Sequence, residues 1–221
     1  MEMYLTEEER VEALKRWWKE NASAVFLGIG LGIAALSGWN LWEKNQNQKA
    51  EQASLLYQKL MQTQAEADPG KNANAEAATR LAEDIVKTAP DSLYGTYAQL
   101  YLIHREVENQ KLAAAHQKLD ALLAKTQDPQ LKTLVSVRLA RVMHGEGKTA
   151  DALNLLEKLN AGRLQTGWTS LVSELKGDLL YAQGQKDAAR TAYEQAKRAT
   201  DAASPLLLQK LANLGIAQPS P

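Results

Sequence analysis

The chain has 221 residues, of which 45% are hydrophobic and 24% are charged, and it contains no cysteine. This balance is typical of a folded domain with a water-exposed surface, and the length allows one such domain with an appendage. Residues 43–221 carry 22 basic and 20 acidic side chains, so no excess positive field favours nucleic acid as a partner. The lack of cysteine excludes disulfides, thiolate metal sites, catalytic thiols and lipids linked through cysteine.

The first twenty residues predict an amphipathic helix. Thr6 can cap its start, and Glu9, three residues further on, completes a capping box. Apolar side chains follow at helical spacing: Val11, Leu14, Trp17 and Trp18. Such a helix can lie in the headgroup layer of a membrane, and a short helix in solvent is the alternative.

Residues 21–42 form a run of 22 residues without a charge. As a helix this run would be ~33 Å long and would match the ~30 Å hydrocarbon core of a bilayer. Tryptophans, which favour the membrane interface, stand near both ends: Trp17, Trp18, Trp39 and Trp42. We therefore predict a transmembrane helix, since the core helix of a soluble protein would not need aromatic residues at both ends. Residues 43–53 are expected to be a linker or an extension of this helix.

A cleaved signal peptide is the alternative to a retained anchor. The small residues of Ala35-Leu36-Ser37 stand just ahead of Gly38, where a signal peptidase could cut. Against cleavage, the uncharged run exceeds the usual apolar region of about 7 to 15 residues, and a long polar segment precedes it. These two features favour an anchor that stays in the mature protein.

Basic residues near the span predict its orientation. Four of them precede the span and two follow it closely: Arg10, Lys15, Arg16 and Lys19, then Lys44 and Lys49. Because basic residues concentrate on the cytoplasmic side, we expect a cytoplasmic N-terminus. The remaining domain, residues 54–221, would then lie in the periplasm of a Gram-negative cell, anchored in its inner membrane by this single span.

The predicted span contains a row of small residues. Ala24, Gly28 and Gly32 recur every four residues, which places them on one face of a helix and lets a second helix approach closely. Glycine is also common in membrane helices in general, so helix packing and simple frequency are alternative explanations.

The rest of the chain predicts an all-α domain, because helical periodicity continues from Gln48 to Gly215 without a convincing strand. An offset of 37 residues aligns three segments of this domain. The aligned sets are Gln110, Gly147 and Gly184 at a turn; Ala115, Ala152 and Ala189; Leu119, Leu156 and Tyr193; Leu122, Leu159 and Ala196; and Ile103, Ala140 and Gly177 on the preceding helix. Small residues at helix crossings and glycine at the turn are typical of tetratricopeptide repeats, so we predict stacked helical hairpins.

Both ends of this array are predicted to be covered. An atypical hairpin, formed by residues 54–64 and 74–87, would precede the three repeats as an N-terminal cap. Pro205 can open a last helix that covers the final hairpin with an apolar face, formed by Leu207, Leu208, Leu211 and Leu214.

No residues suggest catalysis or a bound cofactor. His104, His116 and His144 lack metal-ligand spacing, and no phosphate-binding loop or nucleophile motif occurs. Repeat arrays instead bind partners on the concave surface formed by the first helix of each hairpin. We expect the following residues to line that groove or to pack between hairpins: Leu100, His104, Val137, Arg141, His144, Glu174, Asp178 and Tyr181. The lysine and asparagine cluster that clamps a peptide carboxylate in some tetratricopeptide proteins is missing, which disfavours a reader of C-terminal tails.

The chain resembles the YfgM family of single-span proteins nearly from end to end. The resemblance lies in "YLTEEERVEALKRWWKEN", in the glycine-rich span that closes in "GW", and in "LVSVRLARV" and "LKGDLLYAQGQKDAARTAYEQA". It implies a non-enzymatic, ancillary subunit of the SecYEG translocon, whose span contacts the translocon. It further implies that the repeats meet translocating polypeptides and periplasmic chaperones, including a membrane-anchored prolyl-isomerase-like protein. Two other functions stay open, namely a membrane-tethered scaffold or regulator of a signalling protein, and a peptide-binding protein released by cleavage after Ser37.

Overall fold

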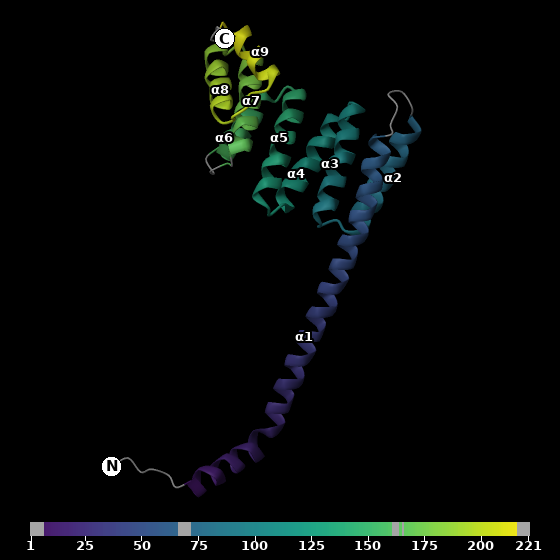
Figure 1. Ribbon diagram of the computed structural model, residues 1–221, viewed down its shortest axis with the longest axis vertical. Coiled ribbons are helices and arrows are strands. Elements are labelled where there is room, and N and C mark those ends of the chain that lie inside the picture. The colour runs from purple at the N-terminus through teal and green to yellow at the C-terminus, as the bar shows by residue number, and fades with distance from the viewer. Residues whose placement is uncertain (1–6, 66–71, 161–163, 165, 216–221) are drawn as a thin grey trace, which may run out of the picture.

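The computed structural model describes residues 7–65, 72–160, 164 and 166–215, and within these residues it contains nine helices and no strand (Figure 1). The prediction of an all-α fold is therefore confirmed. The helices are α1 (Glu7–Ala65), α2 (Asn72–Thr88), α3 (Leu93–Glu108), α4 (Leu112–Lys125), α5 (Pro129–Gly145), α6 (Thr149–Asn160), α7 (Thr166–Ala182), α8 (Lys186–Arg198) and α9 (Pro205–Asn213).

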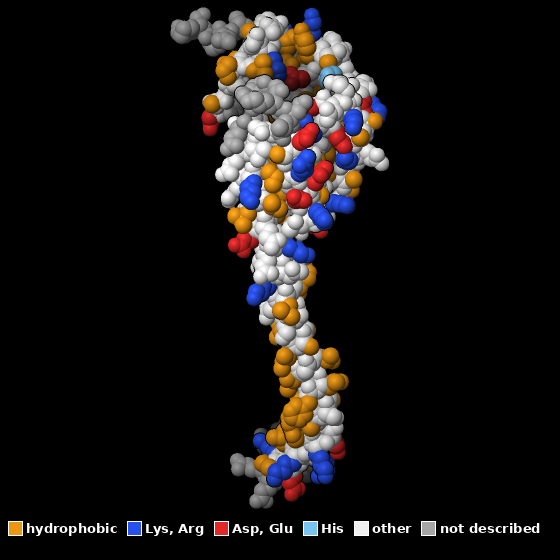
Figure 2. Space-filling view, turned by 90° about the vertical axis from the view of Figure 1, so that its right-hand side faces the viewer, with side chains coloured by type: hydrophobic (Ala, Val, Ile, Leu, Met, Phe, Trp, Pro, Cys, Tyr) orange, Lys and Arg blue, Asp and Glu red, His pale blue; other side chains and the backbone are white. Residues whose placement is uncertain are grey.

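Helix α1 is a single helix of 59 residues that projects far from the body of the molecule (Figure 1). At 1.5 Å per residue it is about 89 Å long. Its apolar segment is long enough to cross a membrane, and none of that segment is buried against the rest of the chain. Figure 2 shows these hydrophobic side chains along the narrow shaft, with charged side chains at its free end. The helix continues without a break through residues 43–53, and the predicted cap Thr6 lies outside the described residues.

The body is a row of antiparallel hairpins, formed by the C-terminal part of α1 with α2, by α3 with α4, by α5 with α6 and by α7 with α8 (Figure 1). Alanines stand at the positions where paired helices cross. Ala115, Ala152 and Ala189 are fully buried there. In the last hairpin, the residue at the crossing position of α7 is Gly177. It lies directly against the ring of Tyr193 on α8. The helices approach closely at these points because the residues there have little or no side chain.

The three repeats close their hairpin turns in the same way. Gln110, Gly147 and Gly184 all adopt positive φ, at 63°, 81° and 77°. In each repeat the next amide donates to a carbonyl five residues earlier, for example Lys111 N to Glu106 O at 2.8 Å and Lys148 N to Met143 O at 2.8 Å. This hydrogen-bond pattern ends a helix at a residue in the left-handed conformation. Glycine is favoured at such a position.

Replacing Gln110 with glycine is therefore expected to stabilise the protein. A side chain with a Cβ atom is strained in the left-handed conformation, whereas glycine is not. We expect a gain of about 0.5 to 1 kcal/mol in the free energy of unfolding, measured by chemical denaturation of the full-length protein. Gln185, which has a negative φ of −83°, is a control at which the same replacement should not stabilise.

Helix α9 covers the open end of the last hairpin (Figure 1). Ser204 caps its start by accepting a hydrogen bond from Leu207 N at 3.1 Å, and Pro205 fits the first turn. The apolar face predicted for this helix packs onto α7 and α8, since Leu207, Leu211 and Leu214 are buried. The array therefore ends in a short helix that covers the apolar surface of the last hairpin.

The other end of the body is fixed directly to α1. A shallow pocket there is lined by Trp42 and Lys49 of α1 and by Pro90 and Asp91 of the loop between α2 and α3. This loop lies against α1 at the end of its apolar segment. The hairpins are therefore joined to the exposed apolar segment by a continuous helix that is itself braced by the α2–α3 loop.

Candidate functional site

A groove of about 400 Å³ opens between hairpin α3/α4 and hairpin α5/α6. It is lined mainly by the first helix of each hairpin, and Leu171 of α7 also lines it. Four of the eight residues expected to line a groove meet here: Leu100, His104, Val137 and Arg141. The structure thus brings half of that set together in one place.

These four residues differ in exposure. Leu100 and Val137 are 2% and 1% exposed, so they form the base of the groove and belong to its packing. His104 and Arg141 are exposed at its edge. His104 Nε2 lies 3.5 Å from Glu108 Oε1 on the same helix. The groove therefore has an apolar base and a basic edge.

The other four expected residues lie outside this groove. Glu174 and Asp178 of α7 pair with Lys210 of α9, whose Nζ donates to Glu174 Oε1 at 2.7 Å and to Asp178 Oδ2 at 2.9 Å. His144 Nδ1 lies 2.9 Å from Thr149 Oγ1, and Tyr181 is exposed at the end of α7. The two carboxylates are thus engaged within the chain, where they fasten α9 to α7.

The Lys210 site is a closed polar cluster. Burial alone would lower the pKa of Lys210, but its hydrogen bonds to Asp178 and Glu174 outweigh burial and raise that pKa. The Tyr193 hydroxyl donates to Asp178 Oδ1 at 2.8 Å, and burial together with this bond raises the pKa of Tyr193. Because every member has a partner, we assign this cluster to stability and not to binding.

Arg138 also lines the groove, and the repeat pattern did not single it out. It lies on α5 one turn before Arg141 and is half-buried. Burial and the neighbouring Arg141 guanidinium hold the pKa of Arg138 below its usual range. The three-dimensional structure shows that Arg138 lines the groove together with residues of α3. The helical pattern of the sequence alone was not a sufficient signal.

Three tyrosines on α1 and α3 lie together, and one of them, Tyr57, interacts electrostatically with Arg138. The ring of Tyr57 on α1 is 5.5 Å from that of Tyr94 and 6.0 Å from that of Tyr97, both on α3. Burial, followed by the nearby Tyr97, raises the pKa of Tyr57, while Arg138 acts in the opposite direction. We call Tyr57, Tyr94 and Tyr97 the tyrosine cluster. It extends the apolar surface beside the groove toward α1.

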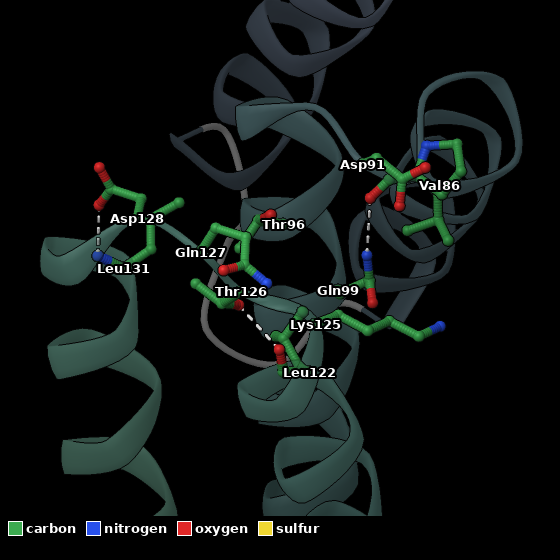
Figure 3. A pocket seen from close by; sticks show the side chains of 11 residues that line it. Val86, Asp91, Thr96, Gln99, Leu122, Lys125, Thr126, Gln127, Asp128 and Leu131 are labelled. Carbon is green, nitrogen blue, oxygen red and sulfur yellow. Dashed lines mark hydrogen bonds between the residues drawn. The ribbon is translucent and has the colours of Figure 1, made fainter.

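A second cleft, of about 540 Å³, lies at the end of the body that faces the shaft of α1 (Figure 3). It is formed by the α2–α3 loop and the α4–α5 loop. Several polar side chains of this cleft form hydrogen bonds with the backbone of the same chain. Asp128 Oδ1 accepts from Leu131 N, Thr126 Oγ1 donates to Leu122 O, and Gln99 Nε2 donates to Pro90 O. These bonds cap helices and hold the two loops, which leaves the cleft a mainly structural role.

The small residues of the apolar segment face open space. A Cβ atom added at Gly28 or Gly32 would meet nothing within 4 Å, and Ala24 is exposed. Most large apolar side chains in the same segment are more than half exposed, for example Phe26 at 64% and Leu36 at 67%. This surface is therefore available to lipid or to another helix. No group of acidic or histidine side chains in the described part of the chain could hold a metal ion.

Stacked hairpins, a shared turn and a groove along their first helices define a tetratricopeptide-like repeat protein. A family model described as a tetratricopeptide repeat-like domain matches residues 15–216. No solved structure gives a significant match to the chain.

The most informative relatives are named ancillary SecYEG translocon subunits. The protein of this name from Escherichia coli K12 is 35% identical over 98% of this chain and 100% of its own length. Those from Haemophilus influenzae and Aggregatibacter actinomycetemcomitans are each 29% identical, over 88% and 95% of this chain and 90% and 98% of their own lengths. The chain belongs to the family of ancillary SecYEG translocon subunits. This membership supports the prediction that it is not an enzyme, and together with the apolar segment of α1 it fits an inner-membrane protein.

Proposed function

We propose that this protein is a non-enzymatic accessory component of the Sec translocon that links translocation to periplasmic chaperones. In this proposal the apolar segment of α1 crosses the inner membrane once, with the N-terminus in the cytoplasm. The repeat domain lies in the periplasm, where it meets translocating polypeptides and chaperones, including a membrane-anchored prolyl-isomerase-like protein. The observation that carries the proposal is the wholly exposed apolar segment of α1 in a chain whose full-length relatives are named translocon subunits.

The glycine row supports a helix partner inside the membrane. Because Gly28 and Gly32 lie four residues apart with open space above both, a neighbouring helix could approach the backbone of α1 closely. Close backbone approach provides van der Waals contact that lipid chains cannot match. We infer that this face of α1 contacts a helix of the translocon.

The basic residues around the apolar segment support the orientation. Arg10, Lys15, Arg16 and Lys19 precede it, whereas only Lys44 and Lys49 follow closely. This asymmetry favours a cytoplasmic N-terminus. The groove between α3 and α5 would then face the periplasm, where newly translocated chains are still unfolded.

Filling the glycine row should separate the protein from the translocon. We expect Gly28→Leu/Gly32→Leu to lower recovery of SecYEG about tenfold or more, because losing roughly 1.4 kcal/mol or more of helix packing has that effect. The measurement is co-purification from detergent-solubilised membranes, followed by quantitative mass spectrometry. The same experiment with the unchanged protein tests the proposal itself, since recovery of neither translocon nor chaperone would contradict it.

A matched control is available on the opposite face. Gly30→Leu/Ala34→Leu introduces two leucines at the same spacing, rotated by about 200° around the helix. This variant should recover SecYEG as the unchanged protein does. A mature N-terminus at Gly38 in the membrane-extracted protein would instead show cleavage and would overturn the anchored arrangement.

A further inference from the structure

Several described cations of the repeat domain are paired with carboxylates. Lys176 Nζ lies 3.0 Å from Glu157, and Lys210 pairs with both Glu174 and Asp178. Lys118 and Arg105 are likewise paired, with Glu106 and Glu108. The surface of the body accordingly shows basic and acidic side chains close together (Figure 2).

Arg138 and Arg141 differ from these paired cations, and they line one groove together. No acidic side chain of the described residues lies within ion-pair distance of either guanidinium, although both line the groove. Arg138 is half-buried, and its nearest charged neighbour of note is Arg141, which repels it. Burying a cation beside another cation is unfavourable unless an anion joins them. The groove therefore presents two positive charges without a counter-charge from the described chain.

The surroundings of the two arginines indicate an elongated ligand with apolar parts. Leu100, Ile103 and Val137 form the base of the groove, and Leu134 and Leu171 also line it. Tyr97 of the tyrosine cluster packs against the same core as Leu100 and Ile103, and Tyr57 interacts electrostatically with Arg138. A small inorganic anion would leave most of this apolar surface uncovered, whereas an extended polypeptide segment would cover it.

We propose that the groove selects extended polypeptide segments in which a carboxylate stands beside apolar or aromatic side chains, and that Arg138 and Arg141 bind that carboxylate. Guanidinium groups bind carboxylates through paired, charge-assisted hydrogen bonds. The apolar neighbours of the carboxylate would lie on the base of the groove and on the tyrosine cluster. This inference rests on the proposed function, because it names the chemistry of the polypeptides that the repeat domain would meet.

The test is binding of labelled peptides to the full-length protein in detergent, measured by fluorescence anisotropy. The first probe is a short amidated peptide with two glutamates among leucines and tyrosines, and the second replaces both glutamates with glutamine. A third is the glutamine peptide with a free C-terminal carboxylate. We expect the glutamate peptide to bind about tenfold more tightly than the amidated glutamine peptide. A preference shown only by the peptide with a free C-terminal carboxylate would assign the arginines to chain ends and would overturn the inference.

The arginines are tested by Arg138→Gln/Arg141→Gln, which should abolish this tenfold preference. Arg80→Gln/Arg198→Gln removes the same charge from exposed positions on α2 and α8 and should keep the preference. Equal binding of all three peptides to the unchanged protein would overturn the inference, and so would an unchanged preference in the double variant. Binding to anionic phospholipid vesicles that is lost only in the groove variant would assign the arginines to lipid and would also overturn it.

Failure of this inference can be told apart from failure of the proposed function. The glycine row and the groove lie on separate parts of the molecule. The groove variant should therefore still recover SecYEG from membranes even where peptide selectivity is lost. Intact recovery with no carboxylate preference would reject the inference alone, whereas absence of SecYEG from preparations of the unchanged protein would reject the proposed function.

Discussion

Replacing Gly95 with alanine adds one methyl group. We expect this replacement to destabilise the protein more than any other that adds a single methyl group. A Cβ atom at Gly95 would lie 2.1 Å from Ala89 O and 2.8 Å from Pro90 O. Both contacts are with backbone atoms, so no side chain can rotate away. Overpacking against backbone costs about 3 kcal/mol, which for a protein of this size lowers the melting temperature by roughly 6 to 12 °C.

The cost is high because the loop around Gly95 has little freedom to move. Ser92 accepts from Gly95 N at 2.9 Å and donates to Ala89 O at 2.8 Å, and Gln99 Nε2 donates to Pro90 O at 3.1 Å. The same loop lies against α1 near Trp42. Moving the Ala89 and Pro90 carbonyls to admit a methyl group would break these bonds.

Thermal unfolding followed by far-UV circular dichroism tests this prediction. Gly167→Ala is the control, since Gly167 is exposed in the first turn of α7 and a Cβ atom there meets nothing within 4 Å. That variant should melt at or slightly above the temperature of the unchanged protein, because alanine favours helix. Equal melting temperatures for the two variants would contradict the steric argument.

Replacing Gly177 with alanine should have the second largest effect. The new Cβ atom would lie 2.4 Å from Cε1 and 2.5 Å from Cδ1 of Tyr193. The ring is held in place because its hydroxyl donates to Asp178 and because Tyr193 is only 3% exposed. We expect a net loss of about 2 kcal/mol, after subtraction of the gain of roughly 1 kcal/mol that alanine brings within a helix.

A double-mutant cycle isolates this contact. Tyr193→Leu alone removes the ring and its hydrogen bond to Asp178, so it destabilises the protein. Adding Gly177→Ala to that variant should cost far less than adding it to the unchanged protein, because the obstructing ring is gone. If the cost of Gly177→Ala is the same in both backgrounds, Tyr193 is not the reason for glycine at this position.

Gly177 and Gly95 differ in whether the sequence alone could predict why glycine is needed there. Gly177 was recognised because the 37-residue offset aligns it with Ile103 and Ala140, and the same offset located the turn at Gln110. Gly95 has no such pattern, since the carbonyls that exclude a side chain come from the loop between α2 and α3. Periodicity identifies helix crossings within the repeats, but it does not describe how an irregular loop folds over a helix.

The groove was predictable only in part for a similar reason. Leu100, His104, Val137 and Arg141 meet as the repeat geometry predicts. Glu174 and Asp178 have the same kind of position on α7, but α9 folds back and its Lys210 takes both carboxylates. Arg138 also lines the groove, although the 37-residue offset did not select it. Such long-range contacts are not encoded in the spacing of residues along one helix.

In the proposed arrangement, helix α1 would set the height at which the groove stands above the bilayer. Tyr57 follows Trp42 by fifteen residues on the same helix, which is about 22 Å along the axis. An extended chain covers about 3.3 Å per residue, so some six or seven residues must leave the membrane before the next one reaches the level of the tyrosine cluster. Because α1 is continuous between Trp42 and Tyr57, this distance would be fixed. In the proposed arrangement, shorter segments on the outer side of the membrane would stay below the groove, and an emerging chain would be met only once such a length has been released.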